Sequence, residues 1–327
     1  MLGILATGCS STPKPPSAPS TTLVWPPAPD APRIAYVQSF ARPSDLGIKQ
    51  SAFTRFGHWL TGSEKGNEAL SKPFGLALDE NDNLCLTDTG ANRVSFYDRS
   101  KMKWQSWNQF GRIRLASPVA IAKSQGIFYV ADSALASVLA FDSAGKLRLQ
   151  ITNHLERPSG LLVVNNQLFV ADSHRHRIVV FDLQGNFQRE FGKRGFRPGE
   201  FNFPTHLAAD SQGNLLVTDS MNSRVQVVDL QGAFKGEIGK MGDSAGQFSR
   251  PKGAAVDPAG RVYVVDGIFD NIQIFDQTGR FLMPLGEAGS KPGEFWLPNG
   301  IAIRRDGEIL VADSYNHRVQ VFKYIGP

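Results

Sequence analysis

The sequence is poor in features that mark several common classes of protein. Its 327 residues include only two cysteines, Cys9 and Cys85, so no disulfide framework beyond a single bond is possible. Cys85 lies in the apolar run NLCLTD, which favours a buried thiol over a reactive one. No long stretch repeats apolar residues with the 3.6-residue period of a helix. The net charge is only +5, and the basic residues are scattered rather than gathered in the stripe typical of nucleic-acid-binding proteins.

The residues that are abundant indicate a large core built from short elements. Hydrophobic residues make up 41% of the chain, which is enough for the interior of one or two domains. The 32 glycines and 20 prolines indicate many turns.

The first nine residues, MLGILATGC, are apolar up to Cys9. They are too few to cross a bilayer, and they lack the basic start of a signal peptide. The small residues Ala6, Thr7 and Gly8 nevertheless resemble a bacterial lipobox, in which signal peptidase cleaves before the cysteine and that cysteine carries a lipid. Ala6 stands where leucine is usual, so a chance cysteine in a tail is the alternative. With Ser10 rather than Asp after the cysteine, the sorting rule of that family implies an outer-membrane lipoprotein facing the periplasm.

Residues 1–9 would then be the remnant of a signal peptide, and residues 10–32 are predicted to be a tether. Pro, Ser, Thr and Ala dominate this segment, so it cannot bury enough apolar surface to fold. In an extended polyproline geometry it would reach about 60 to 70 Å from an anchored Cys9.

A motif that recurs six times accounts for the rest of the chain. The stretch LFVADSHRHRIVVFDLQGNFQREFG, residues 168–192, has relatives such as LLVTDSMNSRVQVVD and ILVADSYNHRVQVF. Its aspartate recurs every 40 to 47 residues, at Asp88, Asp132, Asp172, Asp219, Asp266 and Asp313. A proline opens each unit, at Pro73, Pro118, Pro158, Pro204, Pro251 and Pro298. Six units of about 45 residues predict one repeat protein rather than several domains.

Each unit is expected to form four short strands. In the first unit three of them are PFGLALD, NLCLTD and RVSFYD, and a segment such as FQREFG is the fourth in a later unit. Turns rich in Asp, Asn and Gly, such as DSQGN and DLQGN, lie between the strands. The middle strands are almost wholly apolar, as in sheets that pack on both faces. Six four-stranded sheets around a channel, a β-propeller, is therefore the predicted architecture.

The ring is predicted to close through the N-terminal part of the chain. The last unit ends after its third strand, RVQVFKYIGP, and lacks a fourth. The segment RIAYVQSFARPSDLG, residues 33–47, matches the fourth-strand pattern. We therefore expect residues 33–40 to pair with residues 318–324, which would cover an edge prone to aggregation.

These units resemble the NHL repeat, a family of six-bladed β-propellers. The resemblance rests on the pattern PxG(L/I)A(V/I)D, followed by VDSxNxRVQVFD and GxF, which residues 204–322 match best. The first two units are degenerate, and an insert at residues 48–72 has no counterpart in the others. The resemblance implies an all-β, six-bladed propeller over residues 33–327.

The cluster of Asp172, Ser173 and His174 is predicted to be scaffold rather than a catalytic triad. Asp172 ends one strand and Arg177 begins the next, and this pair recurs as Asp88/Arg93, Asp219/Arg224 and Asp313/Arg318. A catalytic group is needed only once, so the recurrence favours a hairpin pair worth about 0.2 to 1 kcal/mol where it is exposed.

Function in a propeller is expected where the repeat is broken. We call the face that carries the blade-to-blade loops the top face. Its channel mouth should be ringed by the residue after each opening proline, namely Phe74, Val119, Ser159, Thr205, Lys252 and Asn299. His206 replaces the usual Gly at the next position, although packing alone would explain it.

Two families of enzymes with similar propellers allow a comparison of the residues at the channel mouth. Peptidyl-amidating lyases place a zinc-binding His directly after the proline, and none of the six ring residues is His. Calcium-dependent lactonases need a central Glu/Asn/Asp set, of which the ring offers only Asn299. A metal site of His174, His176 and His206 would require turns of adjacent blades to converge over the channel.

Apolar residues also break the repeat on the top face. They stand in the turns between second and third strands, at Leu135, Met221, Ile268, Phe269 and Tyr315. Further aromatic residues occur in the linkers between blades, where Phe201, Phe248 and Phe295 are expected to pack between blades, and Trp296 follows. The insert at residues 48–72 carries Phe53, Phe56, Trp59 and Leu60, which could pack on the propeller or dock a partner.

The sequence thus favours a lipid-anchored, non-catalytic binding propeller of the cell envelope. It would recognise a protein or peptide on its top face through Leu135, Arg175, Arg177, His206, Lys252, Ile268, Phe269 and Asn299. A metal-dependent lyase or hydrolase in the channel is one alternative, and RNA binding, as in cytoplasmic NHL proteins, is another. An exported protein meets no transcripts, so we expect no nucleic acid as a partner, and we expect neither a metal nor a cofactor.

Overall fold

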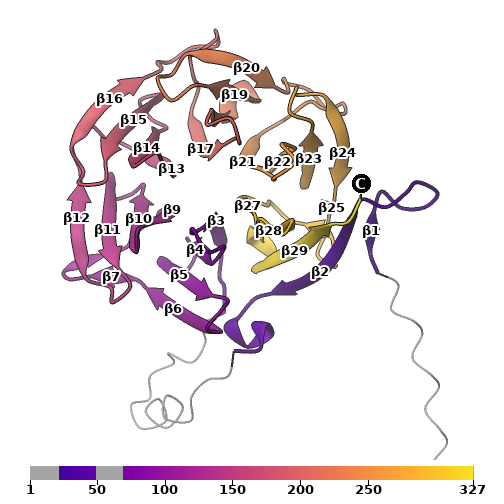
Figure 1. The fold of residues 1–327 in the computed structure, drawn as a ribbon, viewed down its shortest axis with the longest axis horizontal. Helices are drawn as coiled ribbons and strands as arrows, with labels where there is room; N and C mark the ends of the chain where they lie inside the picture. Colours follow the sequence, from indigo (N-terminus) through magenta and orange to yellow (C-terminus); the bar gives the residue numbers. More distant parts are fainter. Residues whose placement is uncertain (1–21, 49–68, 327) are drawn as a thin grey trace, which may run out of the picture.

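The computed structural model describes residues 22–48 and 69–326, which form a ring of six blades (Figure 1). Each blade is an antiparallel sheet whose first strand lies innermost, next to the central channel, as β9, β13 and β17 do in Figure 1. The predicted fold class, an all-β six-bladed propeller, is confirmed.

Blades 1 to 5 each contain four consecutive strands. Blade 1 has β3 (Pro73–Leu78), β4 (Leu84–Asp88), β5 (Arg93–Asp98) and β6 (Lys103–Trp107). Blade 2 has β9 (Pro118–Ser124), β10 (Ile127–Asp132), β11 (Ser137–Asp142) and β12 (Leu147–Ile151). Blade 3 has β13 (Pro158–Val164), β14 (Gln167–Asp172), β15 (Arg177–Asp182) and β16 (Phe187–Phe191). Blade 4 has β17 (Pro204–Ala209), β18 (Leu215–Asp219), β19 (Arg224–Val228) and β20 (Phe234–Ile238). Blade 5 has β21 (Pro251–Val256), β22 (Val262–Asp266), β23 (Asn271–Phe275) and β24 (Phe281–Leu285).

Several shorter elements of the described residues lie in the connections between strands and blades. Two small two-stranded sheets pair β7 (Gln109–Phe110) with β8 (Ile113–Arg114) and β25 (Glu287–Ala288) with β26 (Glu294–Phe295). Three short 3-10 helices are η1 (Pro43–Leu46), η2 (Ser220–Asn222) and η3 (Ser314–Asn316). No helix in the described segments is long and apolar enough to span a membrane.

The core lies between neighbouring blades rather than inside one of them. Second strands such as β4 and β18 are buried along their whole length, whereas the outer strand β16 is exposed at most of its positions. Each of six hydrophobic clusters joins two adjacent blades, so the apolar middle strands are covered on both faces. The ring therefore depends on every blade having two neighbours.

Blade 6 is completed by a strand from the N-terminal part of the chain. It contains β27 (Ile301–Ile303), β28 (Glu308–Asp313) and β29 (Arg318–Tyr324), followed by β2 (Ile34–Phe40). In the pairing of β2 with β29, Ile34 lies opposite Tyr324 and Phe40 opposite Val319. The predicted closure is confirmed.

A fifth strand, β1 (Val24–Trp25), pairs with β2 on the outer edge of blade 6. Residues 22–32 were expected to belong to an extended tether, so the ordered chain begins earlier than the sequence predicts. The reason is local: the Trp25 ring packs edge-on against Phe322, with ring centroids 5.6 Å apart, and covers Gly293. The predicted signal peptide at residues 1–9 and most of the insert at residues 48–72 lie outside the described residues.

Six repeated aspartates fix the loops that form the top face. Each carboxylate accepts hydrogen bonds from backbone N–H groups just before the opening proline of its own blade, as Asp88 does from Ser71 and Lys72. Arg93, Arg224 and Arg318 also form the expected ion pairs with these aspartates. Arg177 does not: it lies opposite Asp172 but forms its ion pair with Glu190, at 2.5 Å.

Candidate functional site

The mouth of the channel on the top face is a cavity of about 380 Å³. All six residues that follow the opening prolines line it, as the repeat predicts: Phe74, Val119, Ser159, Thr205, Lys252 and Asn299. They meet there because each lies at or just before the start of the innermost strand of its blade, and the aspartate of the same blade fixes the preceding loop. The cavity therefore combines one residue from each of six equivalent positions.

Serine hydroxyls fix the wall of this cavity from blade to blade. Ser133 donates to the carbonyl of Pro158, Ser220 to that of Pro251, and Ser314 to that of Pro73. Each of these bonds joins one blade to the opening proline of the next. The cavity wall is thus held by buried or half-buried hydrogen bonds rather than by packing alone.

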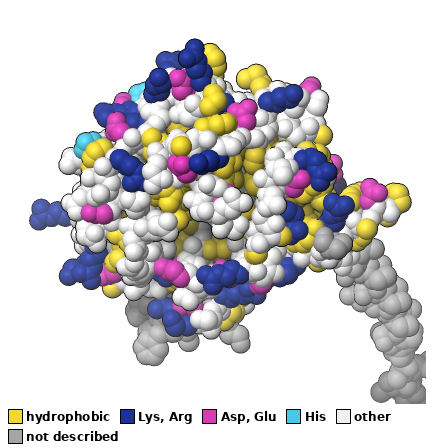
Figure 2. Space-filling model, turned by 45° about the horizontal axis from the view of Figure 1, so that its top comes forward, with side chains coloured by type: hydrophobic (Ala, Val, Ile, Leu, Met, Phe, Trp, Pro, Cys, Tyr) yellow, Lys and Arg dark blue, Asp and Glu magenta, His cyan; other side chains and the backbone are white. Residues whose placement is uncertain are grey.

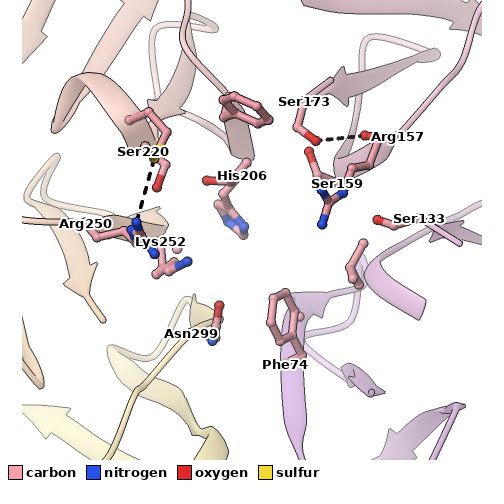
Figure 3. Close-up of a pocket in the computed structure, with 17 residues that line it drawn as sticks. Phe74, Ser133, Arg157, Ser159, Ser173, His206, Ser220, Arg250, Lys252 and Asn299 are labelled. Carbon is pink, nitrogen blue, oxygen red and sulfur yellow. Dashed lines mark hydrogen bonds between the residues drawn. The ribbon is translucent and has the colours of Figure 1, made fainter. Parts of the chain in front are cut away.

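The polar lining of the cavity is basic. Arg157, Arg250 and Lys252 line it together with hydroxyl groups, and no Asp or Glu is among its described lining residues (Figure 3). Burial lowers the pKa of Lys252, and the positive charge of Arg250 lowers it further, against a smaller opposing effect of Asp266. The cavity is therefore suited to a ligand that carries negative charge.

His206 projects into the same cavity from β17 (Figure 3). Gly75, Gly160, Gly253 and Gly300 hold the equivalent position in four other blades, where a Cβ would lie within 2.9 Å of the next blade's backbone. Burial lowers the pKa of His206 to about 4, although a hydrogen bond to the backbone of Ala254 opposes this effect. The imidazole is therefore neutral near pH 7, with its one N–H directed to the Ala254 backbone and its other ring nitrogen left as an acceptor.

The histidines of the recurring motif do not line this cavity, and each has a partner of its own. His174 contacts Glu156 at 2.6 Å, and His176 Nδ1 accepts a hydrogen bond from the backbone N–H of Phe203. Ser173 donates its hydroxyl to the carbonyl of Arg157, so it does not form a triad with His174. Within the described residues, no group of three or more His, Cys, Asp or Glu side chains is placed to hold a metal ion.

The other predicted binding residues are divided among different surroundings. Arg175 forms an ion pair with the exposed Glu156, and Arg177 with Glu190, so these basic groups already have partners. Leu135 packs against the buried cluster between blades 1 and 2, which includes Phe110. Of the apolar pair in blade 5, Ile268 is exposed and Phe269 is half-buried.

Exposed apolar side chains follow the top-face loops of blades 4 to 6, and we call them the apolar arc. Their exposed fractions range from 39% to 78%, and they are Phe196, Met221, Met241, Ile268, Trp296 and Tyr315. Each of these blades contributes two residues to the arc. One lies in the linker that precedes the blade, and the other lies in the turn between its second and third strands. Phe201, Phe248 and Phe295, by contrast, are fully buried between blades, as expected.

Two members of the apolar arc were not singled out from the sequence. Phe196 and Met241 lie in linkers whose overall pattern follows the repeat. Aligning the linkers would have found them: Phe196 corresponds to Asp243 and Ser290, and Met241 to Arg194 and Ala288. A large apolar residue at a position where equivalent linkers are charged or small is a signal of surface function.

Comparison with known proteins agrees with this architecture. The model of the NHL repeat matches residues 295–322, and that of a 6-bladed beta-propeller family matches residues 150–216. The chain contains an NHL repeat within a six-bladed β-propeller. The propeller is also 40% identical over 52 residues to the Protein brain tumor of Drosophila melanogaster. That match covers 16% of this chain and only 5% of the Drosophila protein.

Solved structures with little sequence identity share the fold. An auxiliary nutrient binding protein from Bacteroides thetaiotaomicron aligns with a TM-score of 0.62 at 13% identity, over 78% of this chain and 69% of that one. The virginiamycin B lyase of Staphylococcus aureus aligns with a TM-score of 0.57 at 16% identity, over 78% and 96%. A chain of the nidogen/laminin complex aligns with a TM-score of 0.58 at 16% identity, over 74% and 86%. Proteins that bind partners and a lyase thus use the same propeller.

Proposed function

We propose that this propeller is a non-catalytic binding module that recognises a protein or peptide through the apolar arc on its top face. The observation that carries the proposal is the exposure of six large apolar side chains on consecutive loops of three blades. Exposed apolar side chains do not stabilise the folded protein, whereas their burial by a partner contributes favourably to the free energy of binding.

The composition of the apolar arc supports recognition of a polypeptide. The rings of Trp296 and Tyr315 lie 5.6 Å apart, and Lys72 Nζ is 4.2 Å from the centre of the Tyr315 ring. Lys72 also donates a hydrogen bond to the Tyr315 hydroxyl. Aromatic residues near the centre of an interface contribute much of its binding free energy, and basic groups beside them give orientation.

We also propose that the chain is held at the outer membrane, facing the periplasm, by a lipid on Cys9. Support comes from the lipobox-like residues before Cys9 and the Pro/Ser-rich segment after it. The described chain enters the propeller at β1, on the outer edge of blade 6, so an anchored chain would leave the channel mouth uncovered.

Nucleic acid is a less suitable partner for this surface. On the face that Figure 2 presents, Lys and Arg side chains are spread around the rim with acidic side chains between them. Several cations are already neutralised, such as Arg175 by Glu156. Nucleic-acid binding needs a continuous basic track, because its affinity comes mainly from phosphate contacts.

Site-specific photocrosslinking tests the proposed surface. A benzophenone amino acid would replace Ile268 or Trp296 in the full chain, and Phe234, which is 37% exposed on β20, would be the matched control. We expect the same crosslinked envelope protein at positions 268 and 296, and none at 234. The purified partner should then bind the Ile268→Ser and Trp296→Ser variants about tenfold or more weakly, and Phe234→Ser normally.

Equal crosslinking at positions 234 and 268 would show that the apolar arc is not a specific site. Tight binding of single-stranded RNA by the full chain, with a steep salt dependence, would replace the proposal with nucleic-acid recognition.

A further inference from the structure

The repeat is broken twice at one point on the channel wall of blade 5. Lys252 is the only charged member of the ring of six, and Gly267 follows the blade's aspartate where the other blades have Ser or Thr. A Cβ on Gly267 would lie 3.1 Å from Lys252 Cγ, so the glycine leaves room for the lysine stem. Because Gly267 has no hydroxyl, blade 5 lacks the bond that Ser220 forms in blade 4 with the carbonyl of Pro251. The hydrogen bond from blade 5 to the opening proline of blade 6 is thus missing at the point where the Lys252 stem passes Gly267.

No carboxylate among the described residues forms an ion pair with Lys252, and Asp266 acts on it only from a distance. No Asp or Glu lines the cavity, and neither Lys252 nor the rim residues Arg157 and Arg250 form an ion pair in the described segments. The carboxylate of Asp266 already accepts hydrogen bonds from the backbone N–H groups of Ser249, Arg250 and Ile268. A half-buried ammonium without a counter-ion is costly, and a bound anion would remove that cost.

The groups around Lys252 are neutral and could bind an anion without adding charge. Figure 3 shows His206 and Asn299 near Lys252 and Phe74 across the cavity from it. The Thr205 hydroxyl is buried without a hydrogen-bond partner and can donate to an anion, whereas the His206 imidazole, whose one N–H is directed to the Ala254 backbone, adds no charge near pH 7. The ammonium of Lys252 matches a single negative charge, and the other two cations of the lining, Arg157 and Arg250, are exposed, whereas a phosphate dianion is usually held by several cations close to it.

The cavity is also large enough, and apolar enough on one side, for an organic molecule. Its volume of about 380 Å³ falls in the range of small-molecule sites, about 300 to 1,000 Å³. Phe74 and Val119 form its apolar wall, from blades 1 and 2. The polar wall comes from blades 3 to 6, so a ligand with one charged and one apolar end matches both.

We propose that the channel mouth binds a small organic monocarboxylate, with its carboxylate on Lys252 and its apolar body against Phe74 and Val119. Arg157 and Arg250, at the exposed rim, attract the anion without holding it. This site is separate from the surface proposed for a polypeptide partner, apart from Met221, which lines the cavity and belongs to the apolar arc. Either proposal can fail without the other.

Isothermal titration calorimetry of the full chain tests this site. The probes are benzoate, phenylacetate and hexanoate, each compared with its neutral primary amide. We expect the carboxylates to bind and each amide to bind about tenfold or more weakly, because the amide cannot pair with Lys252. Lys252→Met should reduce the carboxylate affinity to a similar extent. The control Lys240→Met removes an exposed lysine from the linker before blade 5, and it should change the affinity by less than about twofold.

Gly267→Ser provides a second variant that keeps the lysine. It restores a hydroxyl that can reach the Pro298 carbonyl, which lies 3.2 Å from the position of the added Cβ, but it crowds the Lys252 stem. We expect weaker carboxylate binding with an unchanged or higher Tm. Ile268→Ser and Trp296→Ser should leave carboxylate binding unchanged, which separates this site from the apolar arc.

Several outcomes would overturn the assignment. They are equal binding of acids and amides, equal affinity of the Lys252→Met and Lys240→Met variants, or no binding of any carboxylate probe at millimolar concentration. Tighter binding of phenyl phosphate than of benzoate would also overturn it, since the site would then favour a dianion. Lys252→Gln, checked for its fold by circular dichroism, replaces Lys252→Met if the latter does not fold.

Discussion

Replacing Phe40 with alanine tests whether β2 holds the ring closed. Phe40 is 2% exposed and belongs to the cluster that joins blade 6 to blade 1, together with Leu76 and Leu310. Truncating a buried phenylalanine costs about 3 to 5 kcal/mol, because the lost contacts are not replaced and a cavity remains. Val37 lies on the same strand but is 47% exposed, so Val37→Ala should change the stability by no more than about 0.5 kcal/mol.

Urea unfolding followed by far-UV circular dichroism measures both variants under the same conditions. With a slope of about 3 kcal/mol per molar urea, the Phe40→Ala midpoint should fall by roughly 1 to 2 M. Deleting residues 1–42 removes β2 altogether and should lower the midpoint further, since Val319, Val321 and Phe322 then face water.

The reasoning would be refuted if Phe40→Ala and Val37→Ala unfolded at the same urea concentration. It would also be refuted if the protein without residues 1–42 melted like the full chain. Either result would mean that the three strands β27, β28 and β29 suffice to close the ring.

Two further predictions concern the anchor and the channel. Cys9→Ala, expressed with its native upstream sequence, should lose membrane association in cell fractionation, and a wild type that is already found in the soluble cytoplasm would contradict the lipid anchor. The fold lowers the pKa of His206 to about 4, against about 6.5 in the unfolded chain. Between these two pH values the imidazole is protonated in the unfolded state and neutral in the folded state. Stability should therefore fall as the pH falls from about 6.5 to about 4, by up to about 3 kcal/mol, and His206→Gln should remove this part of the pH dependence in urea titrations. An unaltered pH profile in His206→Gln would show that the imidazole is not held neutral by the fold.

The repeat made the architecture predictable because its markers are local. The prolines and aspartates recur in the chain, so the strands, the ring of channel residues and the pairing of residues 33–40 with 318–324 follow from counting. The strand β1 could not be found in this way. Its stability comes from Trp25 on Phe322 and Gly293, which lie at the other end of the chain.

The candidate site was only partly predictable from the sequence, because some of its features depend on contacts between segments that are distant in the chain. Lys252 and His206 could be found from the sequence, because comparing the six units shows that both differ from their equivalents. The role of Gly267 depends on how near its backbone lies to the Lys252 stem, and that proximity is seen only in the folded blade. Leu135 breaks the polar pattern of its turn, which suggested a binding role, yet it packs against the buried cluster between blades 1 and 2.

The position of β2 has a consequence for the order in which the protein is made. A ribosome synthesises β2 before blade 1, but its partner β29 emerges only after blades 1 to 5 have been made. Until then, blade 6 does not exist, and both β2 and the apolar flank of blade 1 lack their neighbours. Contacts between such distant segments form slowly, and unpaired strand edges are open to association with other chains. Protection of the nascent chain against aggregation is therefore needed until β29 has emerged and paired with β2.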